Sequence, residues 1–375
     1  MKKIIIIGGG FAGISAVSKL RQLGETVDIV LIDSKEEFNF LPMLPDIIGR
    51  RIRPDFLEFK LPDFCQKTGA KFIKDEVIKI DLENNTLFSS KDSYHYDYLI
   101  IASGSETNFY GNEAAKKHGF KLDSTKDAIA ILDQLGKNIF DTFIIAGGGY
   151  TGIEVATNLR KYLDHKKLNQ RIVIVERAPS ILGPLPEWMK QYVNNNLKNL
   201  KIEVLTNVTL DKIEADRVAL SNKAEFNKAM LIWTAGVKTA DFIFNLNKEK
   251  TPQGRLKLDE FLRINNNCFA AGDAGTFSYK DKPLRMAVQF SIYQGELAAK
   301  NIMSSIRGSN LKAYKPVDLG YVIPMANNVS CGNIFGINFR GLFATALHYF
   351  MCIYRSRGFR NRMGIITGLL RGGAK

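Results

Sequence analysis

Short apolar runs that end in glycines divide the chain into two similar halves. Residues 4–7 are four isoleucines that run into three glycines, and residues 143–146 are apolar and run into three more glycines. Each run is followed by an aromatic residue, a small residue, another glycine and a helical pattern. A second apolar run then ends in an acid, first at Asp33 and later at Glu176. Two copies of one strand–turn–helix–strand unit, 139 residues apart, predict two α/β modules.

Further apolar runs continue both modules. Residues 96–104, 230–236 and 268–275 each indicate a buried strand that enters a glycine turn, and residues 287–305 have helical spacing. The last of these strands returns the chain to the first module. We therefore expect a fold of class α/β, with two Rossmann-like dinucleotide-binding domains, the second inserted in the first, and a C-terminal amphipathic helical tail that anchors the chain to a membrane. The expected limits are 1–112 with 252–316 for the first domain, 113–251 for the second and 317–375 for the tail.

The first glycine turn has the chemistry of a dinucleotide site. Gly8 allows a tight turn, Gly10 lets the backbone reach a pyrophosphate, and Gly13 lets helix and strand pack closely. Asp33 follows Gly13 by twenty residues, where a carboxylate accepts hydrogen bonds from ribose hydroxyls. A purely structural glycine-rich turn is the alternative interpretation.

The second turn repeats this chemistry with Gly147, Gly149 and Gly152. Glu176 at the end of the next strand favours the ribose hydroxyl of NADH and repels the 2′-phosphate of NADPH. Arg177 beside it acts in the opposite sense, because arginine pairs with phosphate.

Two nested turns of this kind, with Ala102-Ser103-Gly104 and Ala271-Gly272-Asp273 further along, resemble the two-dinucleotide flavoprotein reductases over about residues 1–315. That resemblance implies FAD on the first module, a nicotinamide cofactor on the second, and a ribityl contact from Asp273. The disulfide reductases of this group have a CxxxxC pair early in the chain, and here residues 38–45 contain no cysteine. Residues 38–45, 147–154, 232–237 and 288–295 instead resemble motifs of the type II NADH:quinone oxidoreductases.

The resemblance assigns residues to sites. It implies a catalytic set of Glu154, Gln289, Tyr293 and Gln294, of which Glu154 orients the nicotinamide or relays a proton to the reduced flavin. Glu154 is alternatively an acid stabilised at a helix start, and Gln289 a surface glutamine. Val288 and Tyr293 depart from the family's quinone segment. The FAD set is Gly8, Gly10, Phe11, Ala12, Gly13, Asp33, Pro42, Ala102, Ser103, Gly104, Gly272, Asp273, Val288 and Gln289; the NADH set is Gly147, Gly149, Tyr150, Thr151, Gly152, Glu154, Glu176 and Gly236.

The C-terminal part of the chain is strongly basic. The net charge is +14, and half of it falls in the last 57 residues, which contain no Asp or Glu. Apolar residues recur at helical spacing over 342–354 and again over 363–370, with arginines between the two segments. Basic amphipathic segments of this kind are typical of a membrane interface with anionic lipids. A docking or dimerisation helix and a nucleic-acid-binding tail are the alternatives. No apolar run is long enough to predict a transmembrane helix.

The four cysteines, Cys65, Cys268, Cys331 and Cys352, have no paired spacing, so we expect buried free thiols and no metal site. The resemblance to the type II enzymes, together with the basic amphipathic tail, implies a peripheral enzyme on the cytoplasmic side of the cell membrane. It would pass hydride from NADH to non-covalent FAD and two electrons to a membrane quinone without pumping protons. A sulfide:quinone oxidoreductase, an NADH-dependent reductase of an electron-carrier protein and a flavoprotein with a nucleic-acid-binding tail remain the alternatives, and a homodimer is left open.

Overall fold

The computed structural model describes residues 1–24, 26–280 and 282–373, and the chain forms two compact units within them. Unit 1 comprises Met1–Phe38, Phe59–Glu106 and Val237–Asp318; unit 2 comprises Asn39–Glu58, Thr107–Gly236 and Leu319–Lys375, of which residues 374–375 lie outside the described ranges. These limits differ from the expected domains: the chain crosses between the units after Glu106 and after Gly236, where residues 112 and 251 were expected. The segment 39–58 and the whole C-terminal tail belong to the same compact unit as the second glycine turn.

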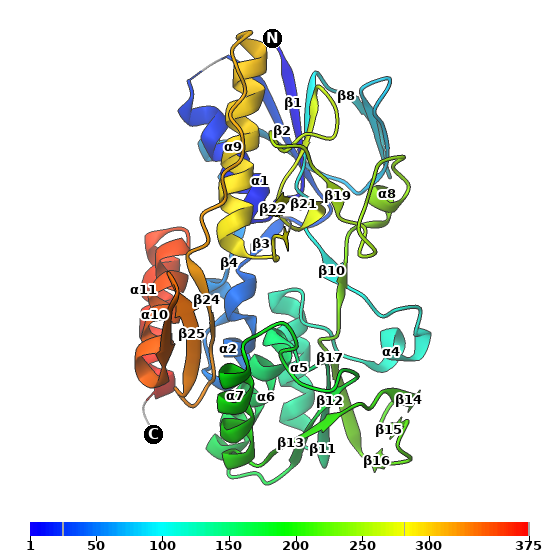
Figure 1. The fold of residues 1–375 in the computed structure, drawn as a ribbon, viewed down its shortest axis with the longest axis vertical. Helices are drawn as coiled ribbons and strands as arrows, with labels where there is room; N and C mark the ends of the chain where they lie inside the picture. The colour runs from blue at the N-terminus through cyan, green and yellow to red at the C-terminus, as the bar shows by residue number, and fades with distance from the viewer. Residues whose placement is uncertain (25, 281, 374–375) are drawn as a thin grey trace. The chain divides into compact units, whose positions relative to one another are not determined.

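Unit 1 is built on a parallel five-stranded sheet in the order β20-β9-β1-β2-β5. Apolar side chains on its strands pack into a closed core because both faces of a parallel sheet are buried. Helices α1 and α9 run side by side in this unit (Figure 1). The main elements are β1 (Lys3–Ile7), α1 (Phe11–Gln22), β2 (Asp28–Asp33), α3 (Leu61–Thr68), β5 (Lys71–Lys74), β9 (Tyr98–Ile101), β20 (Cys268–Ala270), the 3-10 turn η3 (Gly272–Ala274) and α9 (Val288–Ile306).

Smaller elements complete unit 1. An antiparallel sheet of β6 (Val77–Asp81), β7 (Thr86–Ser89) and β8 (Ser93–His95) contributes to the same core. The others are α8 (Asp241–Phe244), β19 (Leu256–Lys257), β21 (Gly275–Thr276), β22 (Ser278–Tyr279) and β23 (Lys282–Pro283). The chain crosses between the units at β3 (Glu37–Asn39), β4 (Glu58–Lys60), β10 (Glu106–Thr107) and β18 (Val237–Lys238).

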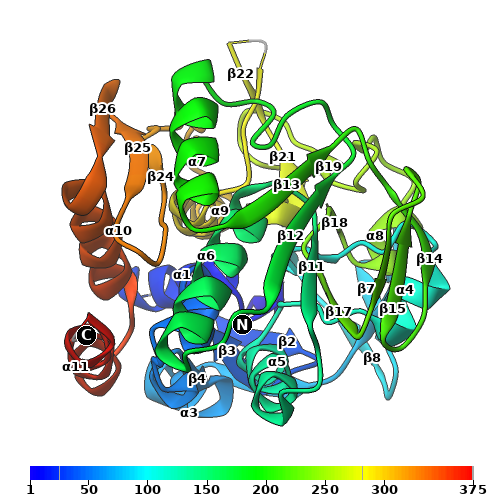
Figure 2. The same ribbon diagram turned by 90° about the horizontal axis from the view of Figure 1, so that it is seen from below.

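Unit 2 has a parallel four-stranded sheet in the order β13-β12-β11-β17 (Figure 2). Its strands and helices are β11 (Thr142–Ala146), α6 (Tyr150–His165), β12 (Arg171–Glu176), α7 (Glu187–Asn199), β13 (Ile202–Thr206) and β17 (Ala229–Trp233), with α4 (Glu113–His118), α5 (Thr125–Lys137) and an antiparallel sheet of β14 (Leu210–Ile213), β15 (Arg217–Leu220) and β16 (Glu225–Asn227). The predicted duplication is confirmed, because β1 lies between β2 and β9 as β11 lies between β12 and β17.

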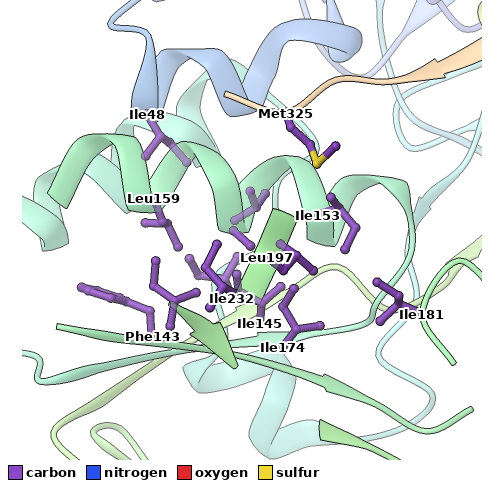
Figure 3. Packing of buried hydrophobic residues seen from close by; sticks show 14 of the residues in the cluster. Ile48, Phe143, Ile145, Ile153, Leu159, Ile174, Ile181, Leu197, Ile232 and Met325 are labelled. Carbon is purple, nitrogen blue, oxygen red and sulfur yellow. The ribbon is translucent and has the colours of Figure 1, made fainter. Parts of the chain in front are cut away.

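The rest of unit 2 comes from two distant segments. The first contains η1 (Leu41–Met43), α2 (Leu44–Gly49) and η2 (Pro54–Phe56); the second contains β24 (Gly320–Ile323), β25 (Ser330–Ile334), β26 (Ile337–Arg340), α10 (Gly341–Arg355) and α11 (Phe359–Gly373). One buried cluster joins both segments to the sheet and its helices, and Figure 3 shows Ile48 of α2 and Met325 after β24 beside residues of α6 and β11. The tail therefore contributes to the core of unit 2.

Both predicted tail helices form, and α10 turns a row of apolar side chains outward. Phe343, Phe350 and Tyr354 are each more than half exposed, while Tyr349 and Cys352 on the opposite face are buried. Among the described helices, none is both long and apolar enough to span a membrane. All four cysteines are buried and free, as expected.

Candidate functional site

The first glycine turn lies between β1 and α1 in unit 1. Gly8 has φ +100°, and a Cβ at this position would lie 2.3 Å from the carbonyl oxygen of Ala102, so only glycine fits. Gly10 is the N-cap of α1 and faces open space, since a Cβ there would meet nothing within 4 Å. Gly13 packs against the carbonyl of Gly8. The result is a helix start whose positive end a phosphate can approach closely.

Asp33 ends β2 and closes this turn. Its Oδ2 accepts a hydrogen bond from the N–H of Gly9 at 2.6 Å, and its Oδ1 accepts one from Lys35 at 2.8 Å. Burial raises the pKa of Asp33, and the two N–H bonds oppose that rise. A carboxylate fixed in this way accepts ribose hydroxyls at the end of a parallel strand.

The second turn repeats this geometry in unit 2. Gly147 has φ +107°, Gly149 is the N-cap of α6 with open space around it, and Gly152 packs against the carbonyl of Gly147. Glu176 accepts hydrogen bonds from Gly148 and Ala178, both at 2.7 Å. Each acid thus binds the middle glycine of its own turn and the amide two residues further on.

The remaining unit 1 residues of the predicted FAD set meet at the carboxyl ends of the strands. Asp273 in η3 accepts a hydrogen bond from the hydroxyl of Ser105 at 2.8 Å, and burial raises its pKa. The hydroxyl of Ser103 is buried and has no hydrogen-bond partner within the described part of the chain. A small pocket lies here, lined by Arg255, Gly272, Asp273, Ala287, Ser291 and Gln294. An unsatisfied hydroxyl, a carboxylate and an open glycine turn fit a flavin dinucleotide.

Arg255, which the sequence reasoning missed, braces this pocket. Its buried guanidinium donates to the backbone carbonyls of Asp273, Gly275 and Leu284. The charge of Arg255 also lowers the pKa of Asp273, in opposition to burial. Arg255 precedes Asp273 by eighteen residues in a different loop, so no local pattern could have indicated the contact.

Helix α9 carries the residues predicted for quinone, and they have different surroundings. Gln294 is 3% exposed, and its Oε1 accepts a hydrogen bond from the N–H of Gly272 at 2.8 Å, so it holds the η3 turn. Tyr293 is 40% exposed and packs on the ring of Tyr314. Gln289 donates to Asp318 at 3.1 Å, and Val288 is the first residue of the helix.

Asp318 is a second residue that the sequence reasoning missed. It is the last acid in the chain, and it binds both Arg285 and Gln289. Asp318 ends unit 1, so this pairing fixes the start of α9 to the point where the chain enters the tail.

Pro42 and Glu154 lie in unit 2. Pro42 belongs to η1, immediately before α2, and Glu154 lies in the second turn of α6. Burial, and then the nearby charge of Asp46, raise the pKa of Glu154 well above its usual range. Gly236 follows β17 with φ +74°, against the hydroxyl of Tyr110.

The duplicated turns and their acids are features of one protein family, and a model of that family matches residues 2–295. The chain belongs to the pyridine nucleotide-disulphide oxidoreductase family. Membership makes it an oxidoreductase and implies that it binds FAD and a pyridine nucleotide. The geometry of unit 1 fits FAD, and the glycine turn of unit 2 fits the pyridine nucleotide.

A curated relative agrees with the resemblance stated from the sequence, and two solved structures have a similar fold. A type II NADH:quinone oxidoreductase of Staphylococcus aureus strain NCTC 8325 is 26% identical, over 89% of this chain and 90% of that protein. The structure of NDH2 from Plasmodium falciparum in complex with NADH is similar with a TM-score of 0.88 and 18% identity, covering 99% of this chain and 98% of that one. The sulfide:quinone oxidoreductase of Aquifex aeolicus has a TM-score of 0.81 and 19% identity, covering 97% and 92%. The resemblance to the type II enzymes is confirmed by the first of these, and the two structures support the fold.

Proposed function

We propose that this chain is a non-proton-pumping NADH:quinone oxidoreductase with non-covalent FAD. The observation that carries the proposal is the pair of dinucleotide turns of the same geometry, each closed by its own acid at the end of the second strand. Two such sites in one chain suit an enzyme that holds a flavin permanently and binds NADH in each turnover. The S. aureus relative supports this choice of donor and acceptor, and the P. falciparum structure of similar fold is a complex with NADH.

The residues divide the work between the units. Gly8, Gly10 and Asp33 bind the ADP half of FAD, while Ser103 and Asp273 bind its sugar and ribityl oxygens. The flavin, when bound, supplies a two-electron acceptor for hydride and a two-electron donor for quinone. Gly147, Gly149 and Glu176 bind NADH, and the carboxylate of Glu176 repels the additional phosphate of NADPH.

Burial and the nearby charge of Asp46 both raise the pKa of Glu154, which favours its protonated form. Reduction of a quinone to a quinol consumes two electrons and two protons, of which NADH supplies both electrons and one proton as hydride. A protonated carboxyl can provide the second proton within hydrogen-bond reach and recover it from solvent. We propose this role for Glu154.

We also propose that α10 places the enzyme on the cytoplasmic surface of the cell membrane. The exposed apolar row of α10 includes Leu342 and the aromatic residues. Three arginines, Arg357, Arg360 and Arg362, follow soon after the end of the helix. Apolar side chains that enter the acyl boundary beside arginines that meet anionic head groups give a peripheral attachment.

The test is the visible spectrum of the purified protein under anaerobic conditions. NADH is expected to bleach the flavin absorbance, and a soluble quinone is expected to restore it. The same addition of NADPH should bleach far more slowly. A yellow protein that sulfide bleaches and NADH does not would contradict the proposal and favour the sulfide alternative.

A further inference from the structure

Three side chains form a buried ionic group inside unit 2. The hydroxyl of Tyr349 in α10 donates to Oδ1 of Asp46 in α2 at 2.7 Å, and Nε of Arg50 lies 3.3 Å from the same oxygen. The guanidinium of Arg50 also stacks on the ring of Tyr349, 4.7 Å from its centre. Asp46, Arg50 and Tyr349 are 4%, 3% and 7% exposed, so water does not screen these charges.

A buried ion pair is weak evidence of stability, because desolvation of the two charges offsets their attraction. Nη2 of Arg50 also donates to the carbonyl of Ala326 at 3.1 Å and to Oδ1 of Asn328 at 2.6 Å, while its Nε makes the ion pair with Asp46 and no hydrogen bond within the described chain. An elaborate polar group in a position that apolar residues could fill suggests a role other than packing.

The group is in contact with the helix that carries Glu154. The N–H of Ala326 donates to the hydroxyl of Thr157 at 3.2 Å, so one residue links Arg50, at the C-terminal end of α2, to α6. Helices α2 and α6 touch where a Cβ on Gly49 would lie 2.4 Å from Oδ1 of Asn158. Gly49 lies about one turn after Asp46, and Asn158 lies one turn after Glu154. The two carboxyl groups therefore occupy helices in direct contact.

Their charges interact across this contact. Burial raises the pKa of Asp46 to about 6, against the opposing influence of Arg50, the Tyr349 hydrogen bond and Lys161. Asp46 is thus largely ionised at neutral pH, and its charge adds to burial in raising the pKa of Glu154. The other titratable groups around the pair are His348, Cys352 and Arg355 on α10. Burial lowers the pKa of His348 to about 4 and raises that of Cys352, so both are neutral at pH 7.

We propose that Asp46, Arg50 and Tyr349 are positioning residues that keep Glu154 protonated, so that the proton on Glu154 depends on the docking of α10 against α2. Tyr349 and Arg50 stabilise the ionised form of Asp46, and ionised Asp46 disfavours a second negative charge on Glu154. If the Tyr349 hydroxyl is lost while the site stays buried, Asp46 loses its phenolic donor and takes up a proton more readily. Glu154 then ionises more readily.

The coupling between α10 and Glu154 does not depend on the proposed function. Only the transfer of the Glu154 proton during quinone reduction rests on it. The coupling connects the helix whose outer face we assign to the membrane with the acid that we assign to proton transfer. Attachment of α10 to a surface would hold Tyr349 in place and keep Glu154 in its protonated form.

The test measures Glu154 directly in the full-length, oxidised flavoprotein without turnover. Infrared spectroscopy follows the C=O stretching band of protonated carboxyl groups through a pH titration, and Glu154→Gln identifies the band of Glu154. Tyr349→Phe keeps the ring beneath Arg50 and removes the donor. Asp46→Asn removes the charge. Both are expected to move the midpoint of the Glu154 band to lower pH, Asp46→Asn by about one unit or more, as the removal of one neighbouring charge does.

Cys352→Ala is the matched control. It alters the same buried face of α10, one turn from Tyr349, without changing the charge or donors at Asp46, so its midpoint should equal that of the unmodified protein. Asp46→Asn leaves Arg50 unpaired and can fail to fold, in which case Tyr349→Phe decides. A midpoint that stays in place in folded Tyr349→Phe would overturn the coupling. A shifted midpoint in a protein that NADH does not reduce would keep the coupling and reject the proposed function.

Discussion

Asp33 and Glu176 each connect a strand end to the middle glycine of a neighbouring turn. The carboxylate is therefore part of the turn as well as a candidate ligand for ribose. A change of charge at this position should alter which nucleotide binds before it alters the fold.

Glu176→Gln tests this at the second turn. The amide cannot repel a 2′-phosphate, so the preference for NADH over NADPH in kcat/KM is expected to fall about tenfold or more, since like-charge contacts cost several kcal/mol. Steady-state rates of quinone reduction with each nucleotide measure it. Glu203→Gln on the adjacent strand β13, which pairs with Arg171 at the surface, is the control and should leave the preference unchanged.

His348 makes stability depend on pH. Its pKa is lowered by burial from 6.5 in the unfolded chain to about 4 in the folded protein. The stability that this gives is fully present above pH 6.5 and is lost as the pH falls toward 4, because the unfolded chain then binds the proton more readily. The free energy of unfolding of His348→Gln should therefore rise relative to that of the unmodified protein as the pH falls from 6.5 to 4. The gain is at most about 3 kcal/mol, reduced by solvent screening because His348 is only half-buried.

Urea denaturation at pH 6.5 and at pH 4 gives the two differences in free energy of unfolding. Asp46, whose pKa is raised, opposes this trend over the same range in both proteins and cancels in the comparison. Equal differences at the two pH values would show that His348 titrates normally.

Local spacing predicted the residues whose role depends on near neighbours. Gly8, Gly13 and Asp33 are recognisable because the turn, the helix start and the second strand are consecutive in the chain. Asp46 and Tyr349 were not predicted as partners, since 303 residues separate them. Gln294 is predicted for quinone because of the family's segment, and the sequence did not predict that its side chain also accepts a hydrogen bond from Gly272. That preference comes from a buried N–H that requires an acceptor.

At the scale of elements, the start of α9 depends on the loop that precedes the tail. Asp318 holds Arg285 and Gln289 together there. Asp318→Asn retains an acceptor for Gln289 and loses the ion pair with Arg285. We expect the KM for a soluble quinone to rise about fivefold, the equivalent of ~1 kcal/mol for a partly exposed pair.

The rate of flavin bleaching by NADH should stay the same in Asp318→Asn, because the change lies outside both nucleotide turns. Stopped-flow reduction and steady-state quinone titrations separate the two effects. Asp211→Asn, an exposed acid on β14, is the control. A slower bleaching step with an unchanged KM would place Gln289 at the flavin rather than at the quinone.

Helix α11 is seated by close approach of its backbone. A Cβ on Gly364 would lie 2.2 Å from the ring of Phe56, and Asn361 donates to the carbonyl of Glu58. Gly364→Ala should lower the free energy of unfolding by about 1–3 kcal/mol through overpacking, despite the better helix propensity of alanine. Gly136→Ala in α5, where a Cβ meets nothing within 4 Å, should raise it by up to about 1 kcal/mol.

Chemical denaturation of both variants measures these changes, and limited proteolysis reports whether α11 detaches first. The sequence predicted that both tail helices form, because amphipathic spacing is a local signal. It did not predict that the tail joins the core of unit 2, since the complementary surface comes from residues 39–58.

At the scale of the whole chain, charge and apolar exposure are both concentrated in the tail. A change on the outer face of α10 should therefore affect attachment to lipid without affecting catalysis with soluble substrates. Phe350→Asp is expected to weaken binding to anionic vesicles about tenfold or more, since a buried Phe contributes about 1.5–3 kcal/mol.

Co-sedimentation with vesicles that contain anionic lipid measures the loss of binding. The same measurement with neutral vesicles shows how much of the binding comes from the charge of the arginines. Ile139→Asp, the same apolar-to-acid change at a side chain that is 54% exposed outside the tail, is the control. Equal binding of Phe350→Asp and the unmodified protein would contradict the attachment through α10. Truncation is a poorer test, because it would also remove Tyr349 and Cys352 from the core.

The two glycine turns are nearly interchangeable parts. They read GGGFAGI and GGGYTGI, and both adopt the same backbone with the same acid-to-amide bond. The first and last glycines of each turn have little room to change, because the backbone lies too close to them for a side chain. What distinguishes the two sites therefore lies around the turns, as at Gly295, where α9 approaches the carbonyl of Ala12 so closely that no side chain fits. Engineers who wish to exchange the cofactors should alter such neighbouring contacts and leave the turns intact.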